Sequence, residues 1–444
     1  MSRRSCLVLM IVGLMLLVGC VGTAQPAADG LPTFTPEVTA QPGVLFVDAN
    51  QSLGSISPLV YGSNYGPWLF VTLDTRPLAV DAHLRYLRFP GGNWGDLNDL
   101  ETWQIDQYIA LCRELGAEPA ISVRLRGGSA EKAAQLVHYV NRTQGYGVRY
   151  WSIGNEPSLY PDYDTQQYNQ EWRAWADAME AVDPEILLVG PDIHQFTANL
   201  ALNPKDKQGR DWMEEFLKAN GDRVDVVVFH RYPFPTDRSG KLPTVAELSA
   251  SSREWDETIP ALRRMVRELT GRDLPVGVTE VNSSWSSNSG GQATMDSHAN
   301  AIWWADSLGR MIRQGTTIVA QFALVGEFGL MDKYDPYPIY FVYRMYQRFG
   351  DQLVYASSDR MDVSVFAAKR ADGVLTILVV NQAEEAVEYP LRLEGVEAGV
   401  AQVWLFDVDH AAQPIGEAQL QKETMLHLPA QSVTIYELAM KGKK

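Results

Sequence analysis

Two glutamates follow short apolar segments of the sequence, and their positions suit acid–base chemistry. Strands are predicted at Arg149–Ile153 and Val276–Thr279, where β-branched and aromatic residues gather. The first strand leads into Asn155 and Glu156, and the second runs directly into Glu280. Carboxylates at the C-terminal ends of parallel strands lie where α/β barrels keep their reacting groups. Two of them predict glycoside hydrolysis, in which one carboxylate is the nucleophile and the other is acid and then base.

A single glutamate at a strand end is weaker evidence for catalysis than the pair is. For Glu156 or Glu280 alone, a helix N-cap or a surface salt bridge explains the residue equally well. The two residues end the predicted fourth and seventh strands, which can face each other across the mouth of a closed barrel. Together they favour catalysis.

From about Leu59 onward, strand and helix patterns alternate along the chain. Eight such units predict an α/β protein with a (β/α)8 TIM barrel rather than an open doubly wound sheet. The predicted strands are Val60–Ser63, Tyr86–Phe89, Pro119–Val123, Arg149–Ile153, Ile186–Val189, Val224–Phe229, Val276–Thr279 and Ile318–Phe322.

After Phe349 the pattern changes to short strands separated by turn signals, which predicts an accessory C-terminal β-sandwich. The early strand Val44–Asp48 precedes the barrel and could join that sheet. We therefore expect an N-terminal strand segment at 44–56, the barrel at 57–347 and the sandwich at 348–444. The predicted sandwich strands are Val363–Lys369, Val374–Asn381, Ala386–Leu393, Ala401–Phe406, Met425–Leu428 and Ser432–Leu438.

Residues 1–20 have the layout of a secretion signal. A basic start precedes the apolar run Leu7–Val18, which is too short to span a bilayer comfortably. The run leads into Cys20 and resembles the lipobox of bacterial lipoproteins, whose cysteine becomes lipidated; an ordinary signal peptide that happens to contain a cysteine is the alternative. Residues 21–43 are rich in Pro, Thr, Ala and Gln and predict a flexible tether. The expected location is the bacterial cell envelope, on the extracytoplasmic side.

Composition limits the partners and cofactors. The net charge of −16 argues against nucleic acid or anionic lipid, so membrane contact is expected through the lipid anchor only. No spacing of cysteine and histidine suggests zinc, and we expect neither a metal nor a cofactor. With Cys6 removed and Cys20 lipidated, only Cys112 would remain, so no intramolecular disulfide is expected. Nothing in the sequence predicts the oligomeric state.

Two motifs resemble those of the large clan of retaining (β/α)8 glycoside hydrolases called clan A. They are Trp151–Pro157 (Trp-Ser-Ile-Gly-Asn-Glu-Pro) and Gly277–Glu280 (Gly-Val-Thr-Glu). The resemblance implies that Glu156 is the acid/base, that Glu280 is the nucleophile and that Asn155 hydrogen-bonds the sugar 2-hydroxyl.

The predicted sixth strand ends in Phe-His-Arg-Tyr, where the clan commonly has a His and a Tyr. The resemblance implies that His230 and Tyr232 lie at the substrate, with the tyrosine hydroxyl near the nucleophile. A capped structural histidine is the alternative for His230. Among the tryptophans near the motifs, Trp94 and Trp285 could stack on sugar rings or belong to the core.

The segment Arg88–Asn93 (Arg-Phe-Pro-Gly-Gly-Asn) resembles arabinofuranosidase-type members in family 51. It implies that Asn93 and Trp94 line the sugar subsite. Arg88 could keep the nucleophile ionised by charge pairing, or form a structural salt bridge. Pro157 fits families 39 and 79 better, and the domain layout resembles all three families. Many clan members have a tryptophan at the end of the eighth strand, where this chain has Gln321 and Phe322.

The sequence thus predicts a secreted, membrane-tethered retaining glycoside hydrolase of carbohydrate polymers or oligosaccharides. Arabinofuranoside is the first candidate substrate, followed by xyloside, glucuronide or galactoside. The alternative is a carbohydrate-binding lipoprotein that kept the barrel and lost turnover.

Overall fold

The computed structural model describes residues 40–234 and 241–440. The predicted signal, Cys20 and most of the predicted tether lie outside these ranges. Within them, no helix combines the length and the apolar character needed to cross a membrane.

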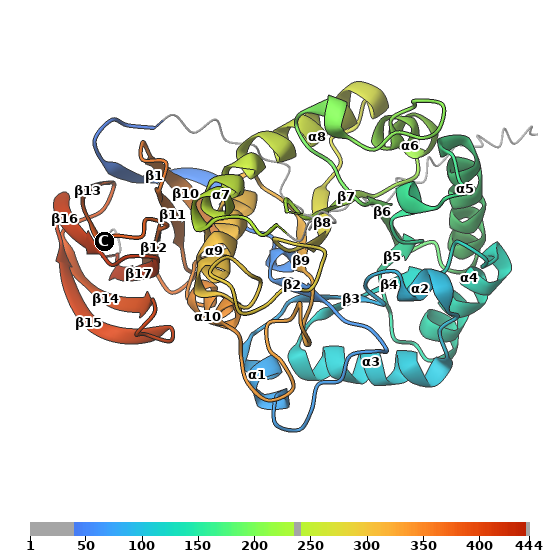
Figure 1. Ribbon diagram of the computed structural model, residues 1–444, viewed down its shortest axis with the longest axis horizontal. Helices are drawn as coiled ribbons and strands as arrows, with labels where there is room; N and C mark the ends of the chain where they lie inside the picture. The colour runs from blue at the N-terminus through green and yellow to red at the C-terminus, as the bar shows by residue number, and fades with distance from the viewer. Residues whose placement is uncertain (1–39, 235–240, 441–444) are drawn as a thin grey trace, which may run out of the picture. The chain divides into compact units, whose positions relative to one another are not determined.

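Eight parallel strands close into a barrel, as predicted (Figure 1). Each strand pairs with the next one along the chain, and the last pairs with the first. The barrel strands are β2 (Gly62–Asn64), β3 (Tyr86–Phe89), β4 (Glu118–Val123), β5 (Tyr150–Ile153), β6 (Leu187–Ile193), β7 (Val226–Arg231), β8 (Val276–Val281) and β9 (Ile318–Gln321).

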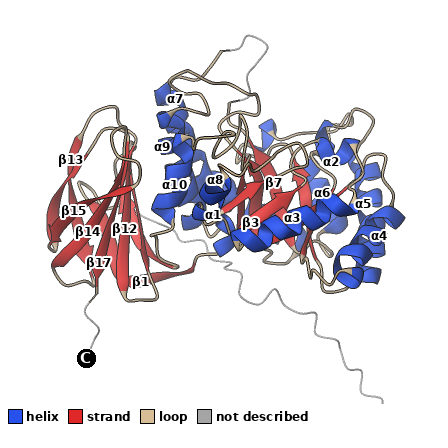
Figure 2. Ribbon diagram, turned by 90° about the horizontal axis from the view of Figure 1, so that it is seen from below, coloured by secondary structure: helices blue, strands red, loops and turns tan. Residues whose placement is uncertain are grey.

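Helices surround the barrel (Figures 1 and 2), and several begin at side chains that cap free backbone N–H groups. Asp164 caps α5 by accepting from the N–H of Gln167, and Ser297 caps α9 in the same way. The α-helices are α1 (Arg76–Asp81), α2 (Trp94–Leu97), α3 (Thr102–Leu115), α4 (Ala130–Val137), α5 (Thr165–Val182), α6 (Trp212–Asn220), α7 (Val245–Ser251), α8 (Trp255–Thr270), α9 (His298–Arg313) and α10 (Pro338–Tyr346).

The barrel interior has an apolar layer and a polar layer. Tyr86, Ala120, Tyr150 and Val228 belong to a buried apolar cluster inside the strands. Side chains alternate along a strand, so residues two positions later point the same way. Those residues are polar and buried, namely Arg88, Ser122, Ser152 and His230. The interior therefore changes from apolar to polar towards the C-terminal ends of the strands.

Some predicted strand limits are wrong. The first strand was expected at Val60–Ser63, but Pro58–Val60 form a 3-10 turn capped by Ser57, and β2 starts at Gly62. A proline at the first helical position suits such a turn because its missing N–H is not needed there. The strands β6 and β7 run beyond their predicted ends, to Ile193 and Arg231.

The C-terminal domain is one nine-stranded sheet that includes β1. The strand β1 pairs antiparallel with β10 and parallel with β13. One face of the sheet encloses its own apolar core, as in a sandwich, with residues such as Leu45, Ile377 and Leu391. The other strands are β10 (Gln352–Ser358), β11 (Val363–Lys369), β12 (Val374–Asn381), β13 (Val387–Glu394), β14 (Gly399–Phe406), β15 (Gln413–Leu420), β16 (Glu423–Leu428) and β17 (Ser432–Ala439).

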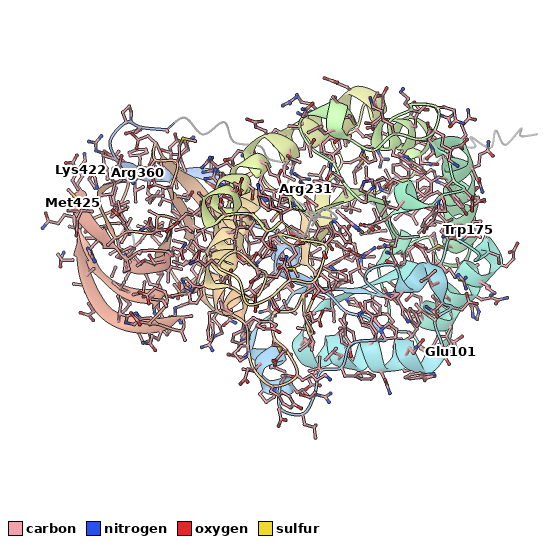
Figure 3. All side chains as sticks on the ribbon, in the orientation of Figure 1. Glu101, Trp175, Arg231, Arg360, Lys422 and Met425 are labelled. Carbon is pink, nitrogen blue, oxygen red and sulfur yellow. The ribbon has the colours of Figure 1, made fainter. Side chains whose placement is uncertain are left out.

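Two strands of this sheet, β10 and β15, were not predicted. The strand β15 is an exposed edge strand with Pro414 and Gly416, so it lacks the apolar alternation that signals a strand. The other edge strand is β16; Met425 on it and the neighbouring Lys422 mark the outer margin of the sheet in Figure 3.

The second face of the sheet packs on the barrel helix α9. The ring of Phe366 lies so close to Gly309 that a Cβ there would come within 2.4 Å of it. Arg310 donates from Nη2 to the Ser364 hydroxyl at 2.9 Å. The helix α9 follows β8 in the chain, after the loop that comes after Glu280. The contact with the sheet therefore fixes the far end of this loop.

Candidate active site

Glu280 on β8 is buried, with 3% of its surface exposed, and both of its carboxylate oxygens accept hydrogen bonds. Its Oε1 accepts from Arg88 Nη1 and from the backbone N–H of Gly92, each at 2.7 Å. Its Oε2 accepts from the Tyr232 hydroxyl at 2.9 Å. Three donors, one of them the cationic Arg88, therefore fix the orientation of this carboxylate.

Glu156 lies just after β5 and is held differently. Its backbone is left-handed, with φ of +46°, which is costly for a residue with a side chain. The Glu156 N–H donates to the carbonyl of Asp192 at 3.0 Å and so helps to hold this conformation. The carboxylate contacts His230 Nδ1 at 3.0 Å and is 12% exposed.

The two carboxylates lie close together. One oxygen of Glu156, one of Glu280 and a ring nitrogen of His230 all lie within 4.8 Å of one another. Retaining glycosidases hold their carboxyl groups about 5–5.5 Å apart, whereas inverting enzymes need about 6.5–9.5 Å to admit a water. The spacing therefore suits a double displacement.

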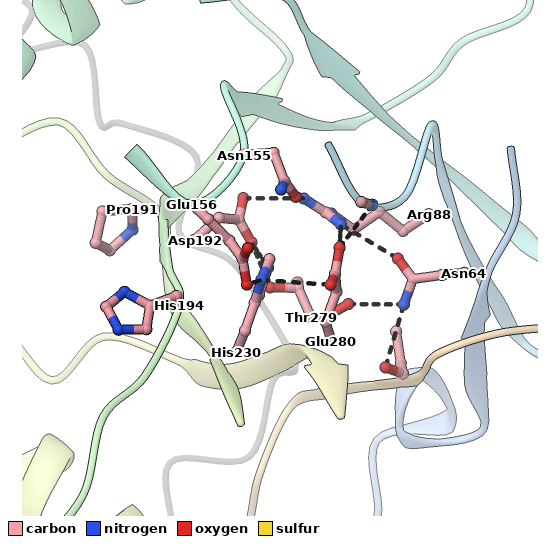
Figure 4. A network of polar contacts seen from close by, with 12 residues as sticks. Asn64, Arg88, Asn155, Glu156, Pro191, Asp192, His194, His230, Thr279 and Glu280 are labelled. Atoms are coloured by element: carbon pink, nitrogen blue, oxygen red, sulfur yellow. Dashed lines mark hydrogen bonds and ion pairs between the residues drawn. The ribbon is translucent and has the colours of Figure 1, made fainter. Parts of the chain in front are cut away.

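The buried His230 bridges these groups (Figure 4). Its Nδ1 lies 3.0 Å from Glu156 Oε1 and 3.5 Å from Glu280 Oε2, and its Nε2 lies 3.3 Å from Asp192 Oδ1. Burial would lower the pKa of His230, but Glu280, Asp192 and Glu156 outweigh it and raise the pKa to about 9. The ring is therefore positively charged at neutral pH.

Arg88 joins the two sides of the site. Besides Glu280, it donates to Asn64 Oδ1 at 3.2 Å and to Asn155 Oδ1 at 2.9 Å. Asn155 in turn donates from Nδ2 to Asn93 Oδ1 at 2.9 Å. The residues predicted from the second, fourth, sixth and seventh strands thus form one hydrogen-bonded network.

A protein-family comparison agrees with this geometry. The profile of the family described as Glycosyl hydrolases family 39 matches residues 129–412, which include both glutamates. The chain belongs to glycosyl hydrolase family 39.

Known relatives of this family 39 chain include two curated enzymes. A β-xylosidase of Geobacillus stearothermophilus is 24% identical over 289 residues, covering 57% of this chain and 51% of the enzyme. A heparanase of Rattus norvegicus is 24% identical over 278 residues, covering 57% and 48%. The chain spans about half the length of these relatives.

Among solved structures, an α-L-arabinofuranosidase of Thermotoga maritima in complex with arabinose has the same fold. Its TM-score is 0.73 at 18% identity, over 89% of this chain and 99% of that one. The likeness confirms a barrel with an accessory β domain.

The two tryptophans predicted at the site, Trp94 and Trp285, differ in burial and packing. Trp94 follows Asn93 at the start of α2, half-buried, and pairs with Trp68 at a ring-centroid distance of 6.3 Å. The end of the Trp68 ring comes within 4.0 Å of a Cβ built on Gly92. Trp285 is 56% exposed. Trp68, which pairs with Trp94, therefore lies beside Gly92, whose backbone N–H donates to Glu280.

Two buried acids at the site were not predicted. Asp96 accepts from the Asn155 N–H at 3.2 Å, and burial, only partly offset by hydrogen bonds from Tyr160 and backbone N–H groups, raises its pKa to about 6. Asp192 lies in β6 under His230. Both stand in segments without a recognisable motif, so only the packing of α2 and β6 reveals them.

The cluster of Glu156, His230 and Glu280 has a spacing that a metal ion would also accept. However, both ring nitrogens of His230 face carboxylates, which a protonated ring satisfies by donating from each. The contacts of His230 with both glutamates are sufficient to explain this spacing.

Proposed function

We propose that this family 39 chain is a retaining glycoside hydrolase that works by double displacement. The observation that carries the proposal is the pair of carboxylates within 4.8 Å, one fixed by Arg88, Gly92 and Tyr232 and the other partly exposed. Such a pair suits a nucleophile and an acid/base.

In the first step, Glu280 attacks the anomeric carbon while Glu156 donates its proton to the leaving oxygen. The glycosidic C–O bond breaks, and the sugar becomes an ester of Glu280. In the second step, Glu156 takes a proton from water, the water oxygen attacks the same carbon, and the ester bond breaks. Two inversions give net retention, and Glu156 is protonated again.

The surrounding residues prepare these steps. Arg88 and Tyr232 hold Glu280 as an anion in one orientation before attack. Asn155 has a second amide hydrogen besides the one that it gives to Asn93, and it can hydrogen-bond the sugar 2-hydroxyl. Trp94 with Trp68 provides an aromatic face for the sugar or its aglycone.

For the sugar, an L-arabinofuranoside is the first candidate and a xyloside the second. The arabinofuranosidase-like segment Arg88–Asn93 supports the first candidate, and the similarity to the Geobacillus β-xylosidase supports the second. The heparanase similarity keeps a uronic acid substrate as a further possibility.

The test is hydrolysis of a panel of nitrophenyl glycosides by the full chain, beside Glu280→Ala. Turnover that Glu280→Ala abolishes, with a first product of unchanged anomeric configuration by NMR, supports the proposal. A first product of inverted configuration contradicts it. Binding of oligosaccharides without turnover on any glycoside or polysaccharide would instead favour the non-catalytic carbohydrate-binding protein.

We further propose that the protein is anchored on the outer side of a bacterial membrane by lipid on Cys20. The support is the lipobox-like sequence at residues 17–20 and the polar segment after it. Metabolic labelling with a radioactive fatty acid tests this. Label should enter the wild type and be absent from Cys20→Ala; equal labelling of both would contradict the anchor.

A further inference from the structure

Asp192 is a buried acid beneath both glutamates, and its side chain is 1% exposed. Its Oδ1 lies 3.3 Å from His230 Nε2 and accepts from the Thr279 hydroxyl. Its Oδ2 lies 3.9 Å from Arg88 Nη2. One carboxylate therefore contacts the charged groups on both sides of Glu280.

The backbone of Asp192 also contacts the site and has an unusual conformation. Its carbonyl accepts from the Glu156 N–H at 3.0 Å, and it is itself left-handed, with φ of +51°. The pairing of β6 with β7 shifts register between Pro191 and Ile193. Asp192 stands in this bulge, where an extra residue re-aims the side chain. Two left-handed residues are thus hydrogen-bonded to each other at the centre of the site.

We propose that Asp192 is the positioning residue that holds the two catalytic glutamates in register, through His230 and Arg88 with its side chain and through Glu156 with its backbone. This inference rests on the proposed glycoside hydrolase function. Asp192 is buried away from substrate and acts through His230, Arg88 and Glu156.

The charges explain the mechanism of this positioning. Burial alone would raise the pKa of Asp192, but Arg88 and His230 lower it to about 2. The anion keeps the His230 ring protonated, so that Nδ1–H points towards Glu156 and Glu280. The titratable and charged groups that face His230 are Glu156 after β5, Asp192 on β6, His194 after β6, Glu280 on β8, Tyr232 after β7 and, through Asp192, Arg88 on β3.

The variant Asp192→Asn tests the proposal with little change of shape. Asparagine tolerates the left-handed conformation, so folding should survive. The neutral amide removes one of the three carboxylates that, with Glu280 first, raise the pKa of His230, and we expect kcat to fall about 100-fold with KM changed less than about 3-fold. The alkaline limb of the pH–activity profile should move to lower pH by at least about one unit. The matched control is Asp225→Asn, directly before β7, where Asp225 accepts from the N–H of Leu188 on β6 at 2.8 Å.

A second measurement needs no turnover. NMR of ¹⁵N-labelled histidine, with the His230 signal assigned by its loss in His230→Gln, follows protonation of the ring directly. The wild-type ring should stay charged to near pH 9, and in Asp192→Asn it should lose its proton at lower pH. A His230 titration that is unchanged in Asp192→Asn would overturn the role of Asp192. A fall in kcat with an unmoved pH–activity profile would also overturn it, because a merely structural loss has that effect. If the wild type hydrolyses nothing, the proposed function fails, and the NMR result alone decides whether Asp192 controls His230.

Discussion

Glu280 and Glu156 lie within 4.8 Å of each other, yet the protein holds them in opposite ways. Glu280 belongs to strand β8, is 3% exposed and accepts hydrogen bonds at both oxygens. Glu156 follows its strand in a left-handed conformation, and its side chain is 12% exposed with His230 as its neighbour.

The different environments of Glu280 and Glu156 suit the tasks of a nucleophile and of an acid/base. A nucleophile gains from being fixed and ionised before attack, because reorganisation then costs little in the transition state. An acid/base must exchange protons with the leaving group and with water, so it needs access and fewer partners. The asymmetry of the two sites therefore supports the assignment of Glu280 as nucleophile and Glu156 as acid/base. The predictions below test it.

The largest effect is expected from the two glutamates. The variant Glu280→Ala should lose at least about 10⁴-fold in kcat on every substrate, because no covalent intermediate can form. The variant Glu156→Ala should lose about 10²–10⁴-fold on poor leaving groups but form the intermediate readily from dinitrophenyl glycosides, which need no proton. Burst kinetics on both kinds of substrate measure this. If the activity of Glu280→Ala instead depended on the leaving group, Glu280 would be the acid/base and Glu156 the nucleophile.

Removing Arg88 should disturb the Glu280 side of the site most. In Arg88→Ala the buried Glu280 and Asp192 lose one of their two cations, so kcat should fall about 10³-fold and the free energy of unfolding by about 3–5 kcal/mol. Urea denaturation and kinetics measure both. The control is Arg76→Ala, whose ion pair with Glu114 is exposed, so its loss should change stability far less than the loss of Arg88. Equal losses in the two variants would contradict the buried charge network.

His230 links the two glutamates and should make stability depend on pH. Its pKa is about 9 in the folded protein and 6.5 in the reference state, so its stabilisation is complete below pH 6.5 and is lost as pH rises through 9. The expected loss is about 3 kcal/mol between these values. Thermal unfolding of wild type and His230→Gln across this range measures it. Curves that stay parallel from pH 6.5 to 9 would show that the ring is neutral.

The smallest effect is expected from Tyr232, which gives one of three hydrogen bonds to Glu280. The variant Tyr232→Phe keeps the ring and removes the donor, so kcat should fall about 10- to 100-fold. A matched control is Tyr139→Phe, whose hydroxyl contacts Asp106 away from the glutamates. No loss of kcat in Tyr232→Phe would mean that Arg88 and Gly92 suffice.

Much of the site could be predicted because local patterns mark it. Asn155, Glu156, His230, Tyr232 and Glu280 all follow apolar strand segments, and a closed barrel brings strand ends to one face. Trp285 shows the limit of this reasoning: it follows Glu280 by five residues, yet its side chain is 56% exposed. Nearness in sequence does not determine where a loop side chain points.

Asp192 and Asp96 could not be predicted, for a physical reason. An aspartate in a Gly-Pro-Asp-Ile segment carries no signal of its own, and its role depends on a bulge that turns its side chain under His230. The pairing of Trp68 with Trp94 likewise depends on the fold of two separate loops.

The amino-acid sequence by itself determined the alternation of strands and helices, the apolar interior and the strand-end position of both glutamates, because periodicity and burial are local properties of the chain. Only the tertiary structure decided which charges meet. Arg88, Asp192, His230 and Glu280 come from four strands, and their protonation depends on distances of 2.7–3.9 Å that barrel closure sets.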